Sequence, residues 1–302
     1  MNNGTHLPAS NEPGTLYRNP GGRRKRHAID RLMNFVCCGS TALLALMVAL
    51  VLYYVAAEGL ASISWKFLVH LPRPVGVPGG GMGNGILGSI IMVLMGSALG
   101  ISVGVPVGIY LAEYGNGNTG NSIRFLTEVM NGIPTIVSGV VVYWLVVVPM
   151  HTFSAYAGAI ALAIIMLPLV SRATEVAVRQ VPQSWREASI ALGATPARTI
   201  WSVVTPGART GIITGALLAV ARIAGETAPL LFTSFGNDVQ WPTHLGMATA
   251  GLPLQIFVYA MSPYSEWKSQ AWAGAFVLVM GLLLLNVVVR AFAGRSAISM
   301  QG

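Results

Sequence analysis

Long runs of apolar residues are the feature that most restricts how this chain can fold. Six of them are long enough to cross about 30 Å of hydrocarbon, which takes roughly 20 helical residues. They lie at Phe35–Ala56, Gly85–Leu111, Phe125–Val148, Tyr156–Val178, Gly207–Phe232 and Ala271–Val289. In lipid, a helix satisfies every backbone polar group internally. We therefore expect an all-α integral membrane protein with six transmembrane helices.

Composition supports a membrane location and excludes several other classes. Of the 302 residues, 54% are hydrophobic and only 9% are charged, whereas ordinary soluble domains are about 25% charged. The net charge of +8 would suit nucleic acid, but the basic residues lie in short segments beside apolar runs, without a soluble module to carry them. The histidines are scattered, and Cys37 and Cys38 are adjacent within an apolar run. We expect lipid as the surroundings, no nucleic acid partner, no metal site and no catalytic cluster.

The distribution of basic residues predicts the orientation. With the amino terminus inside, the inner segments hold fourteen Lys and Arg and the outer segments hold three. Both termini are then cytoplasmic. We expect a disordered basic arm at 1–32, a first helix with an external loop at 33–84, a permease domain at 85–292 and a cytoplasmic tail at 293–302. A cleaved signal peptide is the alternative for the amino-terminal region, but its apolar part would span only about 7 to 15 residues.

Small residues within two runs predict close packing and an interruption. Gly96, Gly100, Gly104 and Gly108 recur every four positions in the second run, a spacing that favours close contact with another helix over a functional hinge. The run from Gly132 to Gly139 interrupts the third span with two glycines and a proline. This interruption predicts either an irregular segment that lines a pore or a packing kink.

Two pairs of charged residues are candidates for a path through the membrane. Arg222 lies about fifteen residues into the fifth run, where a charge costs about 2.5 to 3.5 kcal/mol and therefore usually faces a cavity or a partner. Glu226 would share its helix face, as Glu175 would with Arg172 at the inner end of the fourth run. Guanidinium groups bind oxyanions with paired donors, and a neighbouring carboxylate would permit release. The alternatives are an ion pair that only permits insertion, and ordinary flanking charge.

Residues 184–206, the coupling segment, form a polar stretch between the fourth and fifth spans. Ser184 and Glu187 have the spacing of a capping box, which predicts a helix start. Gly193 would end this helix, and Pro206 would begin the fifth span. The alternative is an ordinary surface hairpin.

The coupling segment also contains a known motif. The sequence Glu187-Ala188-Ser189, followed by Gly193 and later by Pro206, resembles the EAA loop of ABC importer permeases, with Ser189 in the place of the usual second alanine. The run from Arg222 to Pro229 resembles more narrowly the phosphate-specific permeases of the PstA family.

The resemblance implies a fold, a location and a set of functional residues. The fold would be a MetI-like permease core with an added amino-terminal helix, in the bacterial inner membrane. The implied translocation path comprises Arg172, Glu175, Arg222 and Glu226. The implied contact with an ATPase comprises Glu187, Ala188, Gly193 and Pro206.

The resemblance further implies partner proteins. These are a PstC-like second permease forming a heterodimer, a PstB-like ATPase dimer and a PstS-like phosphate-binding protein, with phosphate as substrate. None of the three lysines follows a glycine, so the chain has no phosphate-binding motif of the Walker type. We therefore expect a transporter subunit without enzymatic activity or cofactor, whose partner ATPase binds ATP and Mg. The alternatives are a permease for sulfate, molybdate or phosphonate, and a secondary transporter, which usually shows internal repeats.

Overall fold

The computed structural model describes residues 20–77 and 79–298. These residues form helices and connecting loops, with one isolated bridge between Phe235 and Thr249. The chain divides into two compact units, residues 1–53 and 54–302, and we describe each by itself. Five helices of the described part are long and apolar enough to span a membrane, and a sixth span results if one bent pair counts as one. The predicted all-α membrane fold is confirmed.

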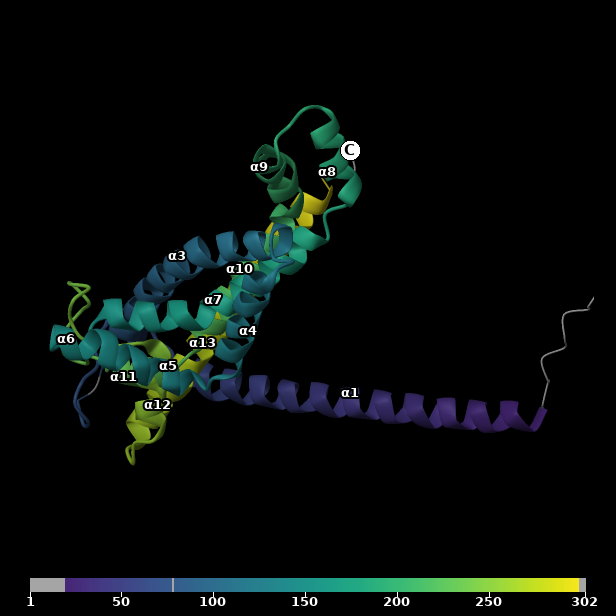
Figure 1. Ribbon diagram of the computed structural model, residues 1–302. Coiled ribbons are helices and arrows are strands. Elements are labelled where there is room, and N and C mark those ends of the chain that lie inside the picture. The colour runs from purple at the N-terminus through teal and green to yellow at the C-terminus, as the bar shows by residue number, and fades with distance from the viewer. Residues whose placement is uncertain (1–19, 78, 299–302) are drawn as a thin grey trace, which may run out of the picture. The chain divides into compact units, whose positions relative to one another are not determined.

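The first unit contains most of helix α1, Pro20–Ser62 (Figure 1). We predicted disorder up to residue 32, but the helix already begins at Pro20. Arg23 to Arg26 are good helix formers, and no breaker separates them from the apolar run, so the helix extends into the basic stretch. Residues 1–19 and 299–302 lie outside the described part, and the expectations for them stay predictions.

The centre of the second unit is the contact between α3, Gly83–Glu113, and α7, Ala155–Arg179. The glycine repeat of α3 faces α7: a Cβ at Gly96 would lie 3.0 Å from the Ala159 carbonyl oxygen, and one at Gly108 would lie 2.5 Å from that of Ser171. The predicted close helix contact is confirmed. Helix α10, Thr205–Ala224, also packs on α7, where Gly211 faces the Ala177 side chain.

The third apolar run is bent into two helical pieces. Helix α4, Asn118–Gly132, ends where Ile133 and Pro134 adopt extended backbone angles. Proline lacks an N–H and disfavours the helical conformation of the residue before it, which explains the break. Helical structure resumes in α5, Thr135–Val142, and continues through η1, Tyr143–Val147, and α6, Val148–Met150. The two pieces meet at 102°, so the predicted interruption of the third span is present, and the expected run Phe125–Val148 is divided between two helical pieces.

The fifth run differs from the prediction at both ends. Its helix begins at Pro196 in α9, Pro196–Thr199, and passes through η2, Ile200–Val204, into α10. The span therefore begins before Pro206, which lies in the first turn of α10 directly after η2. At the other end α10 stops at Ala224, because Gly225 caps it, and a separate helix α11, Ala228–Thr233, follows.

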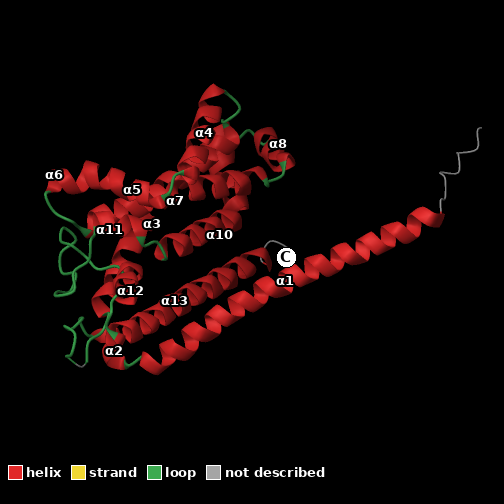
Figure 2. Ribbon diagram, turned by 90° about the horizontal axis from the view of Figure 1, so that it is seen from below, coloured by secondary structure: helices red, strands yellow, loops and turns green. Residues whose placement is uncertain are grey.

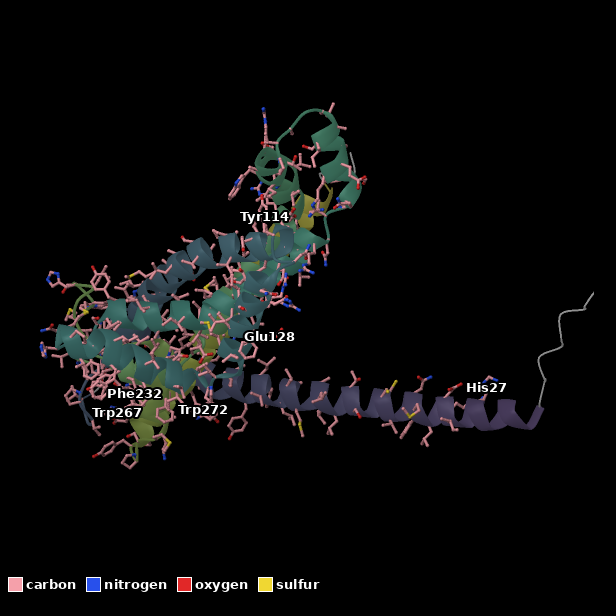
Figure 3. All side chains as sticks on the ribbon, viewed as in Figure 1. His27, Tyr114, Glu128, Phe232, Trp267 and Trp272 are labelled. Carbon is pink, nitrogen blue, oxygen red and sulfur yellow. The ribbon has the colours of Figure 1, made fainter. Side chains whose placement is uncertain are left out.

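The remaining helices lie at the two ends of this unit. Helix α8, Gln183–Ala191, and α9 lie at one end, where α13, Ser265–Ile298, also ends (Figures 1 and 2). Helix α6, α11 and α12, Leu252–Ala260, lie at the opposite end, and α2 is the short helix Trp65–Val69. Trp267 and Trp272 lie near α12 (Figure 3), as aromatic residues do at a membrane interface.

The α3–α7 contact generates a stability prediction. In Gly108→Ala the new methyl group would meet the Ser171 main-chain oxygen, so we expect the unfolding free energy to fall by about 1 to 3 kcal/mol. Thermal unfolding in detergent micelles measures this change. The control is Gly281→Ala on α13, where nothing lies within 4 Å of the added Cβ, and it should leave the midpoint unchanged or slightly higher. Equal midpoints for the two variants would contradict the prediction.

Candidate functional site

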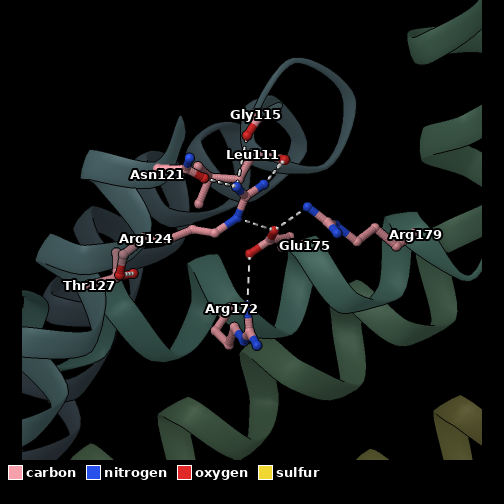
Figure 4. Close-up of polar contacts among 8 residues, drawn as sticks. All are labelled: Leu111, Gly115, Asn121, Arg124, Thr127, Arg172, Glu175 and Arg179. Carbon is pink, nitrogen blue, oxygen red and sulfur yellow. Dashed lines mark hydrogen bonds and ion pairs between the residues drawn. The ribbon is translucent and has the colours of Figure 1, made fainter. Parts of the chain in front are cut away.

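A buried carboxylate, Glu175, contacts three arginines near the C-terminal end of α7 (Figure 4). Its side chain is 2% exposed. Oε1 accepts from Arg124 Nε at 2.8 Å and forms an ion pair with Arg179 Nη2 at 2.8 Å, and Oε2 accepts from Arg172 Nη1 at 3.2 Å. The predicted pair of Arg172 and Glu175 is present, but Glu175 is buried among guanidinium groups and does not line the cavity that Arg172 lines.

Arg124 connects three helices. Besides Glu175 it contacts the end of α3, where Nη2 donates to the Leu111 carbonyl and Nη1 to the Gly115 carbonyl, each at 2.7 Å (Figure 4). Carbonyls in the last turn of a helix lack partners within the helix, so an arginine there both satisfies them and complements the helix dipole. The Arg124 side chain is only 19% exposed. This residue fixes α4 to both α3 and α7.

Arg172 and Arg179 are bound more loosely. Their side chains are 59% and 50% exposed, and each has a single contact with Glu175. Arg172 also lines a cavity of about 540 Å³ between α7 and α10, together with Asn131 and Thr214. Its guanidinium therefore retains donors that can bind an anion there.

Arg222 lies beside a second, smaller cavity of about 60 Å³. The cavity is lined by both sides of the break between α4 and α5, including Asn131, Thr135 and Ser138. The irregular backbone at 133–134 therefore borders a cavity, in agreement with the first of the two predicted roles. Asn131 lines both cavities, so it lies between the surroundings of Arg222 and those of Arg172.

The predicted pairing of Arg222 with Glu226 is wrong. Arg222 is in the last turn of α10, and Glu226 follows the end of that helix, so the two do not share a helical face. Among the described residues no ion pair within 4.0 Å joins them. The reason is Gly225, whose N–H bonds the Arg222 carbonyl at 3.3 Å and ends the helix.

The two broken helices meet beside this cavity. A Cβ at Gly139 of α5 would lie 2.7 Å from Pro229 Cα of α11, so these short helices are in close contact. Irregular backbone at membrane depth is tolerated where it lines a cavity or packs on protein. The chain breaks at 133–134 and 225–227 satisfy this condition together.

The coupling segment forms a helical hairpin at the start of the fifth span. Helix α8 has Pro182 at its N-cap without a side-chain cap, so the predicted capping box of Ser184 and Glu187 is wrong. The predicted end of the helix at Gly193 is confirmed, since the φ of Gly193 is +86°. The Gly193 N–H donates to the Ile190 carbonyl at 2.9 Å, and the Ala194 N–H donates to the Ser189 carbonyl at 3.2 Å. This is a Schellman motif, which favours glycine at the left-handed position.

The exposed face of the coupling segment is partly apolar. Leu192 is 90% exposed, and Trp201, Ile190 and Trp185 are 63%, 52% and 46% exposed. Glu187 and Ala188 are also exposed. Large apolar side chains exposed on a polar hairpin indicate a surface that binds another protein.

The coupling segment is also fixed to the membrane helices. Arg186 Nη2 lies 2.7 Å from Glu113 Oε1 at the end of α3, and its Nη1 donates to the Val181 carbonyl at 2.6 Å. The two side chains of the pair are 14% and 13% exposed. Sequence reasoning did not identify Arg124, Asn131, Glu113 or Arg186, because their partners lie far away along the chain.

A separate polar cluster lies at the α12 end of the molecule. Gln255 Nε2 bonds Asp238 Oδ1 at 3.4 Å, and Asn84 Nδ2 bonds the Asn237 carbonyl at 2.6 Å. Burial, with a smaller effect of the Asp238 charge, raises the pKa of Tyr259 to about 12. These groups hold the 234–251 loop against α3 and α12. Within the described residues, no three His, Cys, Asp or Glu side chains are grouped to bind a metal ion.

Comparison with known proteins agrees with this arrangement. Residues 104–297 match the family described as "Binding-protein-dependent transport system inner membrane component". The "Phosphate transport system permease protein PstA" of Yersinia pestis is 41% identical over 273 residues, covering 89% of this chain and 92% of that protein. The "Probable phosphate transport system permease protein PstA" of Methanocaldococcus jannaschii is 35% identical, covering 86% of this chain and 92% of its own length.

Solved structures share the fold. A chain of the MetNI methionine ABC transporter in an inward-facing conformation superposes with a TM-score of 0.59 at 21% identity, covering 71% of this chain and 95% of that chain. The match is to the fold alone. The predicted MetI-like core is confirmed.

Broken membrane helices around a cavity with an arginine, and an exposed helical hairpin at the start of the fifth span, define a membrane-embedded transport permease. The sequence comparisons make the assignment narrower. The chain belongs to the binding-protein-dependent transport system inner membrane component family and, within it, to the PstA permeases.

The arginine cluster generates a second stability prediction. Glu175→Gln removes the carboxylate charge that Arg124, Arg172 and Arg179 share, and breaking a buried ion pair costs about 3 kcal/mol. Most of this loss should come from Arg124, since the other two side chains are half exposed. The midpoint of thermal unfolding in micelles should fall well below that of Glu128→Gln, an exposed glutamate of α4. Similar midpoints would show that the cluster contributes little.

Proposed function

We propose that this chain is the PstA subunit of an ATP-driven importer that moves inorganic phosphate across the bacterial inner membrane. The observation that carries the proposal is Arg222, a guanidinium beside a cavity at the breaks of two membrane helices. The names of the relatives, which are phosphate transport permeases matched over most of their length, support phosphate as the substrate.

The chemistry of the Arg222 cavity suits an oxyanion. Among the described residues Arg222 has no acidic group within 4.0 Å, so its charge is available to a ligand. A guanidinium can donate two parallel hydrogen bonds to one phosphate. The hydroxyl groups of Thr135 and Ser138 line the same cavity and offer further donors.

Arg172 provides a second position on the proposed path. It lines the larger cavity, which Asn131 shares with the Arg222 cavity, so an anion that leaves Arg222 meets Arg172 next. Glu175 competes with the anion for Arg172 and thereby aids release. Glu226 lies in the break after α10, where its charge would limit how tightly the anion is held.

The energy source would be a separate ATPase. The exposed face of the coupling segment, with Glu187, Ala188 and Gly193, would bind a PstB-like ATPase dimer, and this dimer would bind ATP and Mg. Pro206 would support this contact from the base of the hairpin. A PstC-like permease would form a heterodimer with this chain, and a PstS-like protein would deliver phosphate from outside.

The charge distribution and the fold support an orientation. The end of α13 lies at the same end of its unit as α8 (Figures 1 and 2), and the inner segments carry most basic residues. Both termini and the coupling segment would then face the cytoplasm. In this orientation the α12 end faces the binding protein outside.

Two other functions use the same groups. A permease for sulfate, molybdate or phosphonate would share the guanidinium chemistry, and the relatives favour phosphate over these anions. A secondary transporter would need no ATPase, and it would leave the exposed apolar face of the coupling segment without a partner.

The first functional prediction concerns Arg222. In proteoliposomes that contain this chain with its second permease, ATPase and binding protein, Arg222→Gln should reduce ATP-dependent uptake of labelled phosphate by about 100-fold, because the guanidinium that lines this cavity is lost. Arg209→Gln, which removes an exposed charge from the same helix, should leave uptake unchanged. Wild-type uptake without ATP, or equal uptake by Arg222→Gln, would contradict the proposal.

The second functional prediction concerns the coupling segment. At Gly193 the backbone has φ of +86° and nothing lies within 4 Å of an added Cβ, so conformation alone decides which residues fit. Gly193→Val should distort the hairpin and lower ATPase retention on co-purification, whereas Gly193→Asn, which tolerates the left-handed conformation, should retain it. Equal ATPase retention by both variants would show that this turn does not shape the ATPase contact.

A further inference from the structure

The C-terminal turn of α3 is held from two sides by arginines of other elements. Arg186 of α8 pairs with Glu113, the last residue of α3, at 2.7 Å. Arg124 of α4 donates to the Leu111 and Gly115 carbonyls at the same turn, each at 2.7 Å. The end of α3 therefore lies between the coupling segment and α4.

Both arginines also hold the inner end of α7. Arg186 donates to the carbonyls of Val178 and Val181, at 3.1 and 2.6 Å. Arg124 donates to Glu175, one helical turn before Val178, at 2.8 Å. Each arginine thus connects the end of α3 to the end of α7, and the two connections lie about one turn apart along α7.

These connections are buried enough to transmit a displacement. The Arg186 and Glu113 side chains are 14% and 13% exposed, and those of Arg124 and Glu175 are 19% and 2% exposed. Ion pairs shielded from water interact more strongly than surface pairs and are screened less by salt. The hydrogen bonds to fixed main-chain carbonyls further restrict the motion of both guanidinium groups.

We infer that Arg186–Glu113 and Arg124–Glu175 form a relay that carries a displacement of α8 to Arg172. When α8 moves, Arg186 draws the ends of α3 and α7 with it, and this shift changes the distance from Glu175 to Arg124 on α4. While Arg124 holds Oε1, Arg172 is attached to Glu175 by one contact of 3.2 Å through Oε2. When Arg124 withdraws, Glu175 binds Arg172 more tightly and removes it from the cavity.

The inference rests on the proposed function, because it takes Arg172 as a phosphate contact and α8 as the ATPase contact. Within that function it assigns Arg124 and Glu113 as positioning residues. Neither lines the cavity of Arg222 or that of Arg172. Their loss should therefore leave Arg222 and its cavity in place and disturb the link between ATP hydrolysis and transport.

The test is the amount of labelled inorganic phosphate taken up per ATP hydrolysed, in proteoliposomes with the complete complex. Arg124→Gln and Glu113→Gln should each lower this ratio about 5-fold or more, the size of a typical coupling between sites. ATP hydrolysis and co-purification with the ATPase should persist. The double variant should be no worse than the poorer single variant, because both act in one relay.

Arg209→Gln is the matched control, since it removes an exposed charge from α10 and should keep the wild-type ratio. Unchanged ratios in both single variants, or losses that multiply in the double variant, would overturn the relay. If Arg124→Gln does not assemble, Arg124→Lys provides the test. The lysine ammonium can pair with Glu175, but it lacks the planar fork that reaches the Leu111 and Gly115 carbonyls. A wild-type ratio of phosphate taken up to ATP hydrolysed in Arg124→Lys would overturn the relay. A wild-type complex without ATP-driven phosphate uptake would instead refute the proposed function.

Discussion

The close approach of α3 to α7 is the constraint on which the rest of the second unit depends. In lipid, helices gain little from burying apolar surface against one another, so close packing has to hold them together. The glycines of α3 allow this approach, with Gly108 directly over the Ser171 carbonyl. The same approach brings the α3 carbonyls and Glu175 of α7 within reach of one guanidinium, that of Arg124. The glycine repeat and the arginine contacts are therefore parts of one arrangement.

The sequence predicted the straight helices well and the broken ones poorly. The fourth span was expected at Tyr156–Val178 and is observed at Ala155–Arg179, because a long, mainly apolar run indicates both the type and the length of a helix. An apolar run does not show a change of direction, since membrane helices tolerate single glycines and prolines. The break at 133–134 was therefore recognised only as an irregularity, and the one at 225–227 was missed.

The sequence likewise predicted contacts within one helix and missed contacts between helices. Arg172 and Glu175 are three apart on one helix, so their spacing predicted their contact, which the structure confirms. Arg124 reaches Glu175 from 51 residues away along the chain. Its only signal in the sequence was one positive charge among the fourteen of the inner segments, and that signal concerned orientation. Contacts between helices depend on how the helices cross, which one sequence does not specify.

The arginines of the second unit differ in how many carboxylate and carbonyl oxygens their guanidinium groups already contact. Arg124 is engaged by Glu175 and by two carbonyls, Arg172 has one longer contact with the same carboxylate, and Arg222 has no acid within 4.0 Å among the described residues. In the proposed path, an anion would therefore meet Arg222, a donor without an acidic partner, first and Arg172, a donor already in contact with Glu175, next. Conduction requires binding that is strong enough for entry and weak enough for exit. Because the contested donor shares Glu175 with Arg124, the strength of the second position can change when the helices move, without any change in the residues that line the path.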